Sequence, residues 1–398
     1  MLPGERMEGT VRRERNRIME ILIGADLVPT QFNWEAFAGA DTLSILGQEL
    51  RELMEKADFR VFNLEAPLTD GDTPIAKCGP RLRIPTRTAP GLRAMGVDLV
   101  TLANNHILDH GEAGLRSTIS TLERVGISWM GAGMTPREAA KPFILERDGI
   151  RVGFYPCAEH EFSIVTENSP GANPFDPMWS LDHIRELKQQ CDYVAVLYHG
   201  GREKYRYPSP ELQRVCRRIA DKGADLVLCQ HSHCVGCREE WNGSTIVYGQ
   251  GNFLLGKSSV EAYQTGMLVK WILSSRESRV EYIPVEKSGA YVRLAGEEKA
   301  VQILGGFHKR SEEIRKPGFV EDAYTRHARE SVLEYYGRSL GRRRYVVFRA
   351  LNLLCGGRLR EKCYTDADAL ALINTLTCEP HRELYASALR SQVQKQEK

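Results

Sequence analysis

The first third of the chain alternates short apolar segments with helical patterns, and this alternation limits the folds that the chain can adopt. Segments 16–26, 59–65 and 97–106 have the apolar runs that are typical of strands. Segments 42–56 and 111–126 have apolar residues at helical spacing. Such alternation predicts an α/β fold in which helices cover a sheet and ligands bind where the strands end.

The middle of the chain continues this pattern with more strands. Asp148-Gly149 and Asn242-Gly243 are turn pairs between apolar segments, so each predicts a hairpin. Segments 191–200 and 224–233 are apolar runs, each preceded by a helical pattern. The first segment ends at His199 and the second at His231 and His233.

Five predicted strands end in side chains that can bind a metal ion. These strand-end residues are Asp26, Glu65, Asn104, Asn105, His106, His199, His231 and His233. Oxygen and imidazole ligands together suit a divalent first-row ion such as Mn, Fe or Zn. A pair of such ions can clamp a phosphoryl group and acidify a bridging water. The sequence therefore predicts one or two divalent ions per chain at this edge of the sheet.

Two histidines and two cysteines lie close together at His231, His233, Cys234 and Cys237. One zinc bound by all four is an alternative, but it leaves the ligands at the other strand ends without a purpose. A redox Cys-x-x-Cys pair normally opens a helix after a strand, whereas two short strands are predicted here. We therefore predict a buried thiol pair that takes no part in metal binding.

Charge and apolar content exclude several classes of protein. The formal net charge is +2, so no overall field favours nucleic acid. No stretch approaches the roughly 18 apolar residues of a membrane span, and the polar first twenty residues do not match an export signal. Most of the ten cysteines lie in apolar runs, which is typical of reduced thiols. We expect a cytoplasmic protein that does not span a membrane.

The pattern predicts four regions. Residues 1–17 form a basic leader, 18–290 an α/β domain, 291–314 a linker and 315–398 a helical C-terminal appendage. The last region is helical in pattern and includes a long basic stretch without proline. It could serve an oligomer or a partner, but we predict that it packs on the domain.

The order of the strand-end residues resembles the calcineurin-like metallophosphoesterase superfamily. Within it, the chain resembles the CapA-type capsule synthesis family, also called poly-γ-glutamate synthesis proteins. The matching segments include GAD at 24–26, NLEAPLT at 63–69, LANNHILDHGEAGLRSTISTL at 102–122, HGGRE at 199–203, HSH at 231–233 and YGQGNF at 248–253. The resemblance covers about residues 18–275 in the right order. It implies a metallophosphoesterase-like β-sandwich flanked by helices.

The resemblance also implies roles for individual residues. The implied metal ligands are Asp26, Glu65, Asn105, His199, His231 and His233. Glu65 would bridge two ions, with Asp26 and His233 on the first ion and the other three ligands on the second. His106 takes the place of the histidine that contacts substrate phosphate and protonates the leaving oxygen, a role that suits an imidazole. Asp109 would orient His106.

The chain departs from the superfamily at two ligand positions. Val28 stands where a histidine usually follows the first aspartate, so the first ion lacks one ligand. Glu65 replaces the shorter bridging aspartate.

The resemblance and the ligand set together predict a metal-dependent hydrolase. It would act on a phosphate ester or a related anionic substrate through metal-activated hydroxide. One alternative is an accessory protein in capsule or poly-γ-glutamate biosynthesis with little or no hydrolysis, so that the partner is an anionic polymer. Another is an interaction module with one ion or none. The sequence predicts no oligomeric state.

Other polar residues have more than one interpretation. Lys77, Arg81 and Arg83 lie in a predicted loop, where they either meet an anionic substrate or are solvated. Glu203 is predicted to accept a hydrogen bond from His199. Asn252 is predicted to set a tight turn, with a role in reaching a ligand as the alternative.

Overall fold

The computed structural model describes residues 18–256, 259–340, 342–356, 358–359 and 365–394. The predicted basic leader, residues 1–17, lies outside the described residues. The chain divides into two compact units, residues 1–324 and 325–398.

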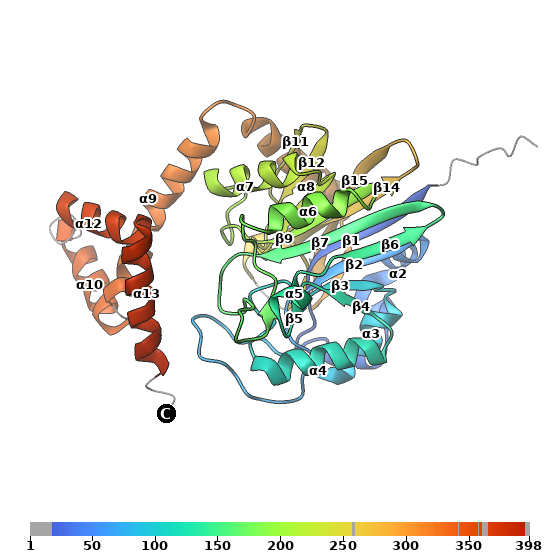
Figure 1. Ribbon diagram of the computed structural model, residues 1–398, viewed down its shortest axis with the longest axis horizontal. Helices are drawn as coiled ribbons and strands as arrows, with labels where there is room; N and C mark the ends of the chain where they lie inside the picture. The colour runs from blue at the N-terminus through green and yellow to red at the C-terminus, as the bar shows by residue number, and fades with distance from the viewer. Residues whose placement is uncertain (1–17, 257–258, 341, 357, 360–364, 395–398) are drawn as a thin grey trace, which may run out of the picture. The chain divides into compact units, whose positions relative to one another are not determined.

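Two sheets form the centre of the first unit (Figure 1). The first sheet has the order β16-β15-β14-β1-β2-β3-β4, and β13 also pairs with β1. Its strands are β1 (Met19–Val28), β2 (Phe59–Leu64), β3 (Leu99–Thr101), β4 (Ser128–Met130), β13 (Asn252–Leu255), β14 (Thr265–Leu273), β15 (Ser278–Ser288) and β16 (Tyr291–Leu294). Strands β1, β2, β3 and β4 are parallel, so their carboxyl ends lie at one edge.

The second sheet has the order β11-β12-β10-β9-β7-β6. Its strands are β6 (Phe143–Arg147), β7 (Ile150–Ala158), β9 (Tyr193–His199), β10 (Leu226–Gln230), β11 (Arg238–Trp241) and β12 (Ser244–Tyr248). A small third sheet pairs β5 (Ala132–Gly133) with β8 (Gly171–Ala172). Asp148 and Gly149 have φ of 54° and 83° in the β6–β7 hairpin, and Asn242 and Gly243 have φ of 48° and 85° between β11 and β12. Both hairpins predicted from the sequence are thus confirmed, with the left-handed residues that such turns need.

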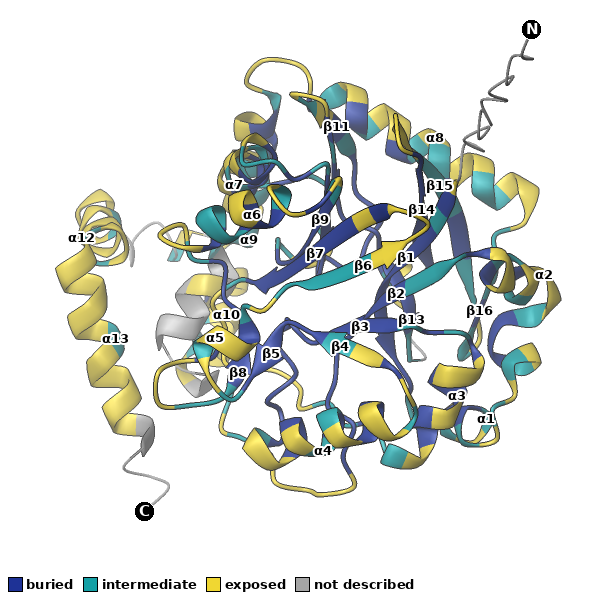
Figure 2. Cartoon of the chain, turned by 45° about the vertical axis from the view of Figure 1, so that its right-hand side comes forward, coloured by how far each residue is buried: buried dark blue, intermediate teal, exposed yellow. Residues whose placement is uncertain are grey.

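Side-chain alternation along the strands explains the layers. Ile21 and Ile23 of β1 belong to the core between the sheets, whereas Leu22 belongs to the core beneath the helices. In Figure 2 the strands are mostly buried, and the outer faces of the helices are exposed. The predicted β-sandwich flanked by helices is confirmed.

Helices cover the outer faces of both sheets. On the first sheet they are α1 (Trp34–Ala38), α2 (Thr42–Lys56), α3 (Ala89–Ala94) and α4 (Gly111–Arg124). On the second they are α6 (Ser180–Lys188) and α7 (Pro210–Asp221), and α5 (Pro136–Ala139) lies beside β5. Asp41 and Ser209 start α2 and α7 as side-chain caps, accepting bonds from Ser44 N at 3.0 Å and Leu212 N at 3.0 Å. Two 3₁₀ turns complete this unit, at Thr86–Thr88 and Glu261–Gln264.

Residues 291–314 differ from the predicted linker. They form strand β16, which pairs with β15, and helix α8 (Glu297–Glu313). Phe307 of α8 is fully buried in the core between the sheets, and its ring centroid lies 4.9 Å from that of Tyr282. The sequence predicted a linker here because the few apolar residues of this segment are divided between a short strand and a helix, so neither element has a clear pattern. The second unit accordingly begins at residue 325 and not at 315.

The second unit is helical, as its pattern predicts. It holds most of α9 (Phe319–Leu340), then α10 (Arg342–Leu354), α12 (Asp366–Thr377) and α13 (Glu379–Gln394). Thr365 and Asp368 form a reciprocal capping box at the start of α12.

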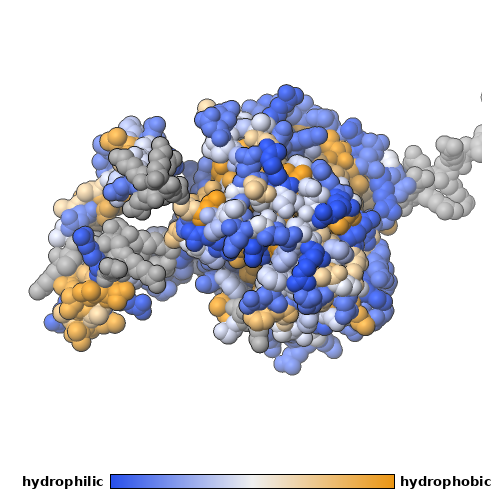
Figure 3. Space-filling model, turned by 90° about the horizontal axis from the view of Figure 1, so that it is seen from below, coloured by the Kyte–Doolittle hydropathy of each residue, from blue (hydrophilic) through white to orange (hydrophobic). Residues whose placement is uncertain are grey.

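The described helices include none with the length and apolar content needed to cross a membrane. On the face drawn in Figure 3, the surface of the first unit is largely hydrophilic, with apolar atoms in small groups.

Candidate metal centre

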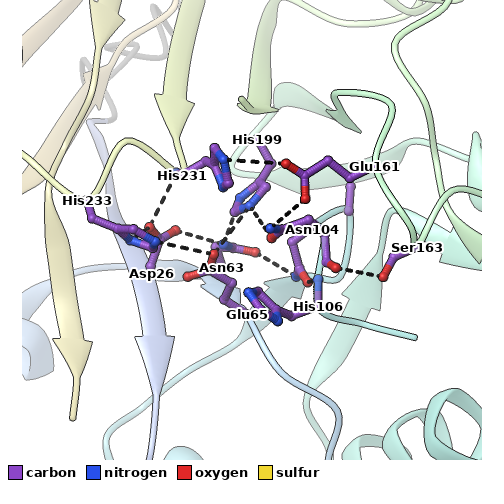
Figure 4. Close-up of polar contacts among 12 residues, drawn as sticks. Asp26, Asn63, Glu65, Asn104, His106, Glu161, Ser163, His199, His231 and His233 are labelled. Carbon is purple, nitrogen blue, oxygen red and sulfur yellow. Dashed lines mark hydrogen bonds and ion pairs between the residues drawn. The ribbon is translucent and has the colours of Figure 1, made fainter. Parts of the chain in front are cut away.

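The strand-end residues of both sheets converge at one edge of the sandwich (Figure 4). Asp26 of β1 is the register partner of Asn63 in β2, and Glu65 lies one residue beyond that strand. His199 is the last residue of β9. Parallel pairing therefore brings carboxylates from one sheet against imidazoles from the other.

Two groups of three side chains could each hold a metal ion. The first triad is Asp26, Glu65 and His233, and the second triad is Glu65, His199 and His231. Within each triad the candidate ligand atoms lie within 4.8 Å of one another, and all five residues are buried. Glu65 belongs to both triads, which matches the bridging position implied for it.

A strained turn after β10 directs two histidines into the centre. His231 and His233 have φ of 78° and 55°, a left-handed backbone that is uncommon for residues other than glycine. The backbone N–H of His231 donates to Asp26 Oδ2 at 3.3 Å, which ties the turn to β1. Strain of this kind persists where the surroundings fix it, and it clusters at functional sites.

Glu65 is a buried carboxylate whose oxygens have no hydrogen-bond partner. It is 1% exposed. Burial, and then the charge of Asp26, raise the pKa of Glu65 to about 8. A buried carboxylate without partners is costly, so the site fits a group that supplies positive charge.

The imidazoles of the second triad are suited to bind an ion directly. Burial lowers the pKa of His199 to about 4 and that of His231 to about 3. Both rings are therefore neutral at neutral pH, which is the form that ligates metals.

His233 of the first triad has the opposite shift. Burial acts to lower its pKa, but the charges of Glu65 and Asp26 outweigh burial and raise the pKa to about 10. For Asp26, burial is in turn outweighed by the hydrogen bond and charge of His233, so its pKa lies below the usual value. An ion in this triad must displace a proton from His233.

Asn63, which the sequence analysis did not select as a site residue, links the two sheets. Its amide nitrogen donates to Asp26 Oδ1 at 2.8 Å and lies 3.2 Å from His199 Nδ1. Its oxygen accepts from Asn104 Nδ2 at 3.1 Å, and Asn104 is fixed in turn by the backbone, donating to Leu64 O at 2.9 Å and accepting from His106 N at 3.1 Å. The strand-end residue Asn104 thus orients its neighbours from behind the centre.

Asn105 lies beside the second triad. Its Oδ1 is 3.1 Å from His199 Nε2, and its Nδ2 donates to Glu161 Oε2 at 3.0 Å. Ser163 Oγ donates to the Asn105 carbonyl at 2.8 Å. Glu161 and Ser163 come from the loop after β7, and no strand-end pattern marks them in the sequence.

His106 and Asp109 form a close pair. His106 Nδ1 lies 2.6 Å from Asp109 Oδ2, and Asp109 is fully buried. Burial acts to raise the pKa of Asp109, but the hydrogen bond and charge of His106 and the bond from Lys77 hold it below the usual value. The carboxylate is therefore ionised against His106.

Two residues, Glu203 and Asn252, differ from the interpretations favoured for them. The polar neighbours of His199 are Asn63 and Asn105, whereas Glu203 is exposed. Asn252 does more than set a turn, because its Oδ1 lies 2.8 Å from His233 Nδ1.

The remaining sequence features take positions around the centre. Cys234 and Cys237 are buried free thiols, and neither belongs to a triad. Val28 is 2% exposed within the core beneath the helices, so no ligand comes from its position. Arg81 and Arg83 bond to carbonyls of their own loop, whereas Lys77 turns inward.

Comparisons with known proteins agree with the resemblance. A family model described as bacterial capsule synthesis protein PGA_cap matches residues 20–257. The chain is 25% identical over 258 residues to the PGA biosynthesis protein CapA of Bacillus subtilis (strain 168), covering 62% of this chain and 66% of that protein. It is 24% identical over 204 residues to the capsule biosynthesis protein CapA of Bacillus anthracis, covering 50% of each. The matched regions thus span between half and two thirds of these relatives.

Among solved structures, a phosphatase from Mycoplasma pneumoniae aligns with a TM-score of 0.45 at 12% identity. The alignment covers 69% of this chain and 95% of that one.

Proposed function

The chain belongs to the PGA_cap family of bacterial capsule synthesis proteins. From the two triads we propose that it is a metal-dependent hydrolase of a phosphate ester or a related anionic substrate. The observation that carries the proposal is Glu65, a fully buried carboxylate without a hydrogen-bond partner that both triads share. A structural role alone does not explain such a group, because burying it costs stability.

The proposed ligands are those of the two triads together with the adjacent amide. They are Asp26, Glu65 and His233 on one side, and Glu65, Asn105, His199 and His231 on the other. Divalent ions bound there, Mn, Fe or Zn, would supply Lewis-acid activation of a phosphoryl oxygen and of a water molecule.

His106 is the proposed general acid. Asp109 Oδ2 accepts from Nδ1, so Nε2 is the nitrogen left to give a proton to the leaving oxygen. The ring is 7% exposed, at the edge of the centre. An imidazole held by a buried carboxylate keeps one tautomer and one orientation, as proton transfer requires.

A second candidate function is an accessory role in synthesis of an anionic polymer such as poly-γ-glutamate. The names of the two Bacillus relatives favour it. Val28 also favours it, because it leaves the first triad with three ligands. In that role the centre would bind the anionic polymer without hydrolysing it.

Metal analysis combined with an esterase assay tests the proposal. The purified protein and a His231→Ala, His233→Ala double variant are analysed for metal and assayed with bis-p-nitrophenyl phosphate. We expect about two ions per chain and metal-dependent turnover, both lost in the double variant. The control replaces two exposed histidines, His160→Ala with His381→Ala, and should keep both properties.

Each other outcome has a distinct meaning. Metal content that is unchanged in the double variant would refute the centre. Bound metal that depends on the histidines, without turnover of any ester, would refute the hydrolase and leave the accessory role.

A further inference from the structure

Lys77 is a buried cation next to the proposed general acid. Its side chain is 2% exposed, although it comes from the loop between β2 and α3, far from His106 in the sequence. Lys77 Nζ donates to Asp109 Oδ1 at 2.5 Å and to the Asn105 carbonyl at 3.1 Å, and it lies 3.3 Å from His106 Nδ1. It is therefore neither solvated nor available to an incoming substrate.

The loop that carries Lys77 is fastened to the same segment by its backbone. Leu82 N donates to Asp109 Oδ2 at 2.6 Å, and Ile75 N donates to the Asp109 carbonyl at 3.0 Å. Thr73 N donates to His110 Nδ1 at 3.1 Å. These bonds hold the ammonium group at Asp109.

The two oxygens of Asp109 have different partners. Oδ1 accepts from Lys77, while Oδ2 accepts from His106 and from Leu82 N. A carboxylate can rotate about its last bond, and a partner on each oxygen prevents that rotation. Lys77 thus fixes the oxygen that faces His106 Nδ1.

We propose that Lys77 is a positioning residue for proton donation by His106, acting through Asp109. By fixing the orientation of Asp109, Lys77 keeps the hydrogen bond between Asp109 Oδ2 and His106 Nδ1 in place. His106 Nε2 then keeps the orientation in which it can give a proton to the leaving oxygen. The ammonium contacts no residue of the two triads, but it also donates to the carbonyl of the proposed ligand Asn105, so the variants are compared at wild-type metal content. This inference rests on the proposed function, because it assigns His106 the role of acid.

The leaving group of the substrate distinguishes this role from a structural one. Phenolate needs a proton as it leaves, whereas p-nitrophenolate leaves readily without one. A positioned acid contributes about 10²–10⁴-fold. Loss of its positioning should therefore slow a phenyl ester far more than a nitrophenyl ester.

The experiment compares kcat of the metal-loaded protein for diphenyl phosphate and for bis-p-nitrophenyl phosphate. For Lys77→Met we expect a loss of about 10²-fold with the phenyl ester and of less than about 5-fold with the nitrophenyl ester. Lys77→Arg keeps a cation with several donors and should retain most of the wild-type ratio. Arg83→Met removes a cation from the same loop whose bonds go to the carbonyls of Asp70 and Gly71, and it should leave the ratio unchanged.

A second variant guards against misfolding. If Lys77→Met does not fold with wild-type metal content, Lys77→Gln, which keeps a polar side chain but has no charge, should show the same selective loss. Equal losses on both esters in the folded variants would overturn the inference and leave Lys77 a structural residue. A wild-type protein that hydrolyses neither ester would overturn the proposed function, and the inference with it.

Discussion

Replacing Glu65 by glutamine should stabilise the metal-free protein and destabilise the metal-bound one. Glutamine has nearly the shape of glutamate but cannot ionise. In the metal-free fold, Glu65 is 1% exposed and neither oxygen has a hydrogen-bond partner, so the charge of His233, whose Nε2 lies 4.0 Å from Oε1, compensates it only in part. In the metal-bound fold, the same charge would be the shared ligand of both triads.

The expected change in the free energy of unfolding follows from the pKa of Glu65. A carboxyl group held at about 8 instead of 4.5 costs the fold about 5 kcal/mol once it is ionised, at about 1.36 kcal/mol per pKa unit. This value already includes the attraction of His233. The buried amide of glutamine also lacks a partner, at a cost of about 1–3 kcal/mol, so we expect a net gain of about 2–4 kcal/mol. Because the pKa is raised in the folded state, the wild-type protein has its full stability below pH 4.5 and loses it as the pH rises to about 8. The advantage of the variant should grow over the same interval and then level off.

Urea unfolding in EDTA, followed by tryptophan fluorescence, measures this difference at about pH 5.5, 7 and 8.5. Saturating metal should reverse the order, since an ion at about 1,000 times its dissociation constant adds about 4.1 kcal/mol to the protein that binds it. Glu49→Gln is the control, because Glu49 is exposed on α2. A variant less stable than wild type in EDTA at every pH would refute the reasoning.

Other changes test separate parts of the centre. Glu161→Ala removes the acceptor of the Asn105 amide and should weaken the ion at the second triad about 10–100-fold by calorimetry, whereas Glu161→Gln should keep most of the affinity; equal affinities in all three proteins would exclude an orienting role. Cys234→Ser and Cys237→Ser should each cost about 1–3 kcal/mol in unfolding, because a hydroxyl replaces a buried thiol, and should leave the metal content unchanged; loss of metal would favour the mixed zinc site instead. Gly24→Ala places a methyl group 2.1 Å from a phenylalanine ring carbon beside β1 and should lower stability by about 1–3 kcal/mol or more, with a lower melting temperature as the measurement; an unchanged temperature would contradict the close approach.

The family resemblance implied the two-sheet sandwich, whereas the alternation of apolar segments and helical patterns was sufficient to predict an α/β fold in which helices cover a sheet. Strand β1 illustrates why, since its residues face two different cores and the chain must cover both faces. Turn pairs with left-handed residues predicted the hairpins, because few other sequences adopt that backbone. The segment 291–314 was not predicted, because a short edge strand and a helix with few buried residues leave a weak pattern.

The candidate ligands could be found from the sequence because they follow strands, and parallel strands end together. Loop residues lack such a rule. Lys77 reaches Asp109 and Glu161 reaches Asn105 only through the path of two long loops. The sequence separation between such a loop residue and its partner follows no rule, because tertiary packing sets the path of the loop. The segment around Lys77 is also rich in proline and glycine, a composition that is typical of a solvated loop.

The two triads differ in the protonation of their histidines and in the number of ligands that they can supply to an ion, and this difference affects the proposed function. In the second triad, burial keeps His199 and His231 neutral, and Asn105 beside them is the proposed fourth donor. In the first triad, an ion must displace a proton from His233, and no fourth donor comes from position 28. Glu65, with a pKa of about 8, must lose its proton to bind an ion in either triad, and His233 must lose a further proton in the first triad alone. We therefore expect the second triad to fill first, and a raised pH to favour both triads but the first more strongly. Hydrolysis by a pair of ions would then depend on occupancy of the weaker triad, whereas binding of an anionic polymer needs only the stronger one.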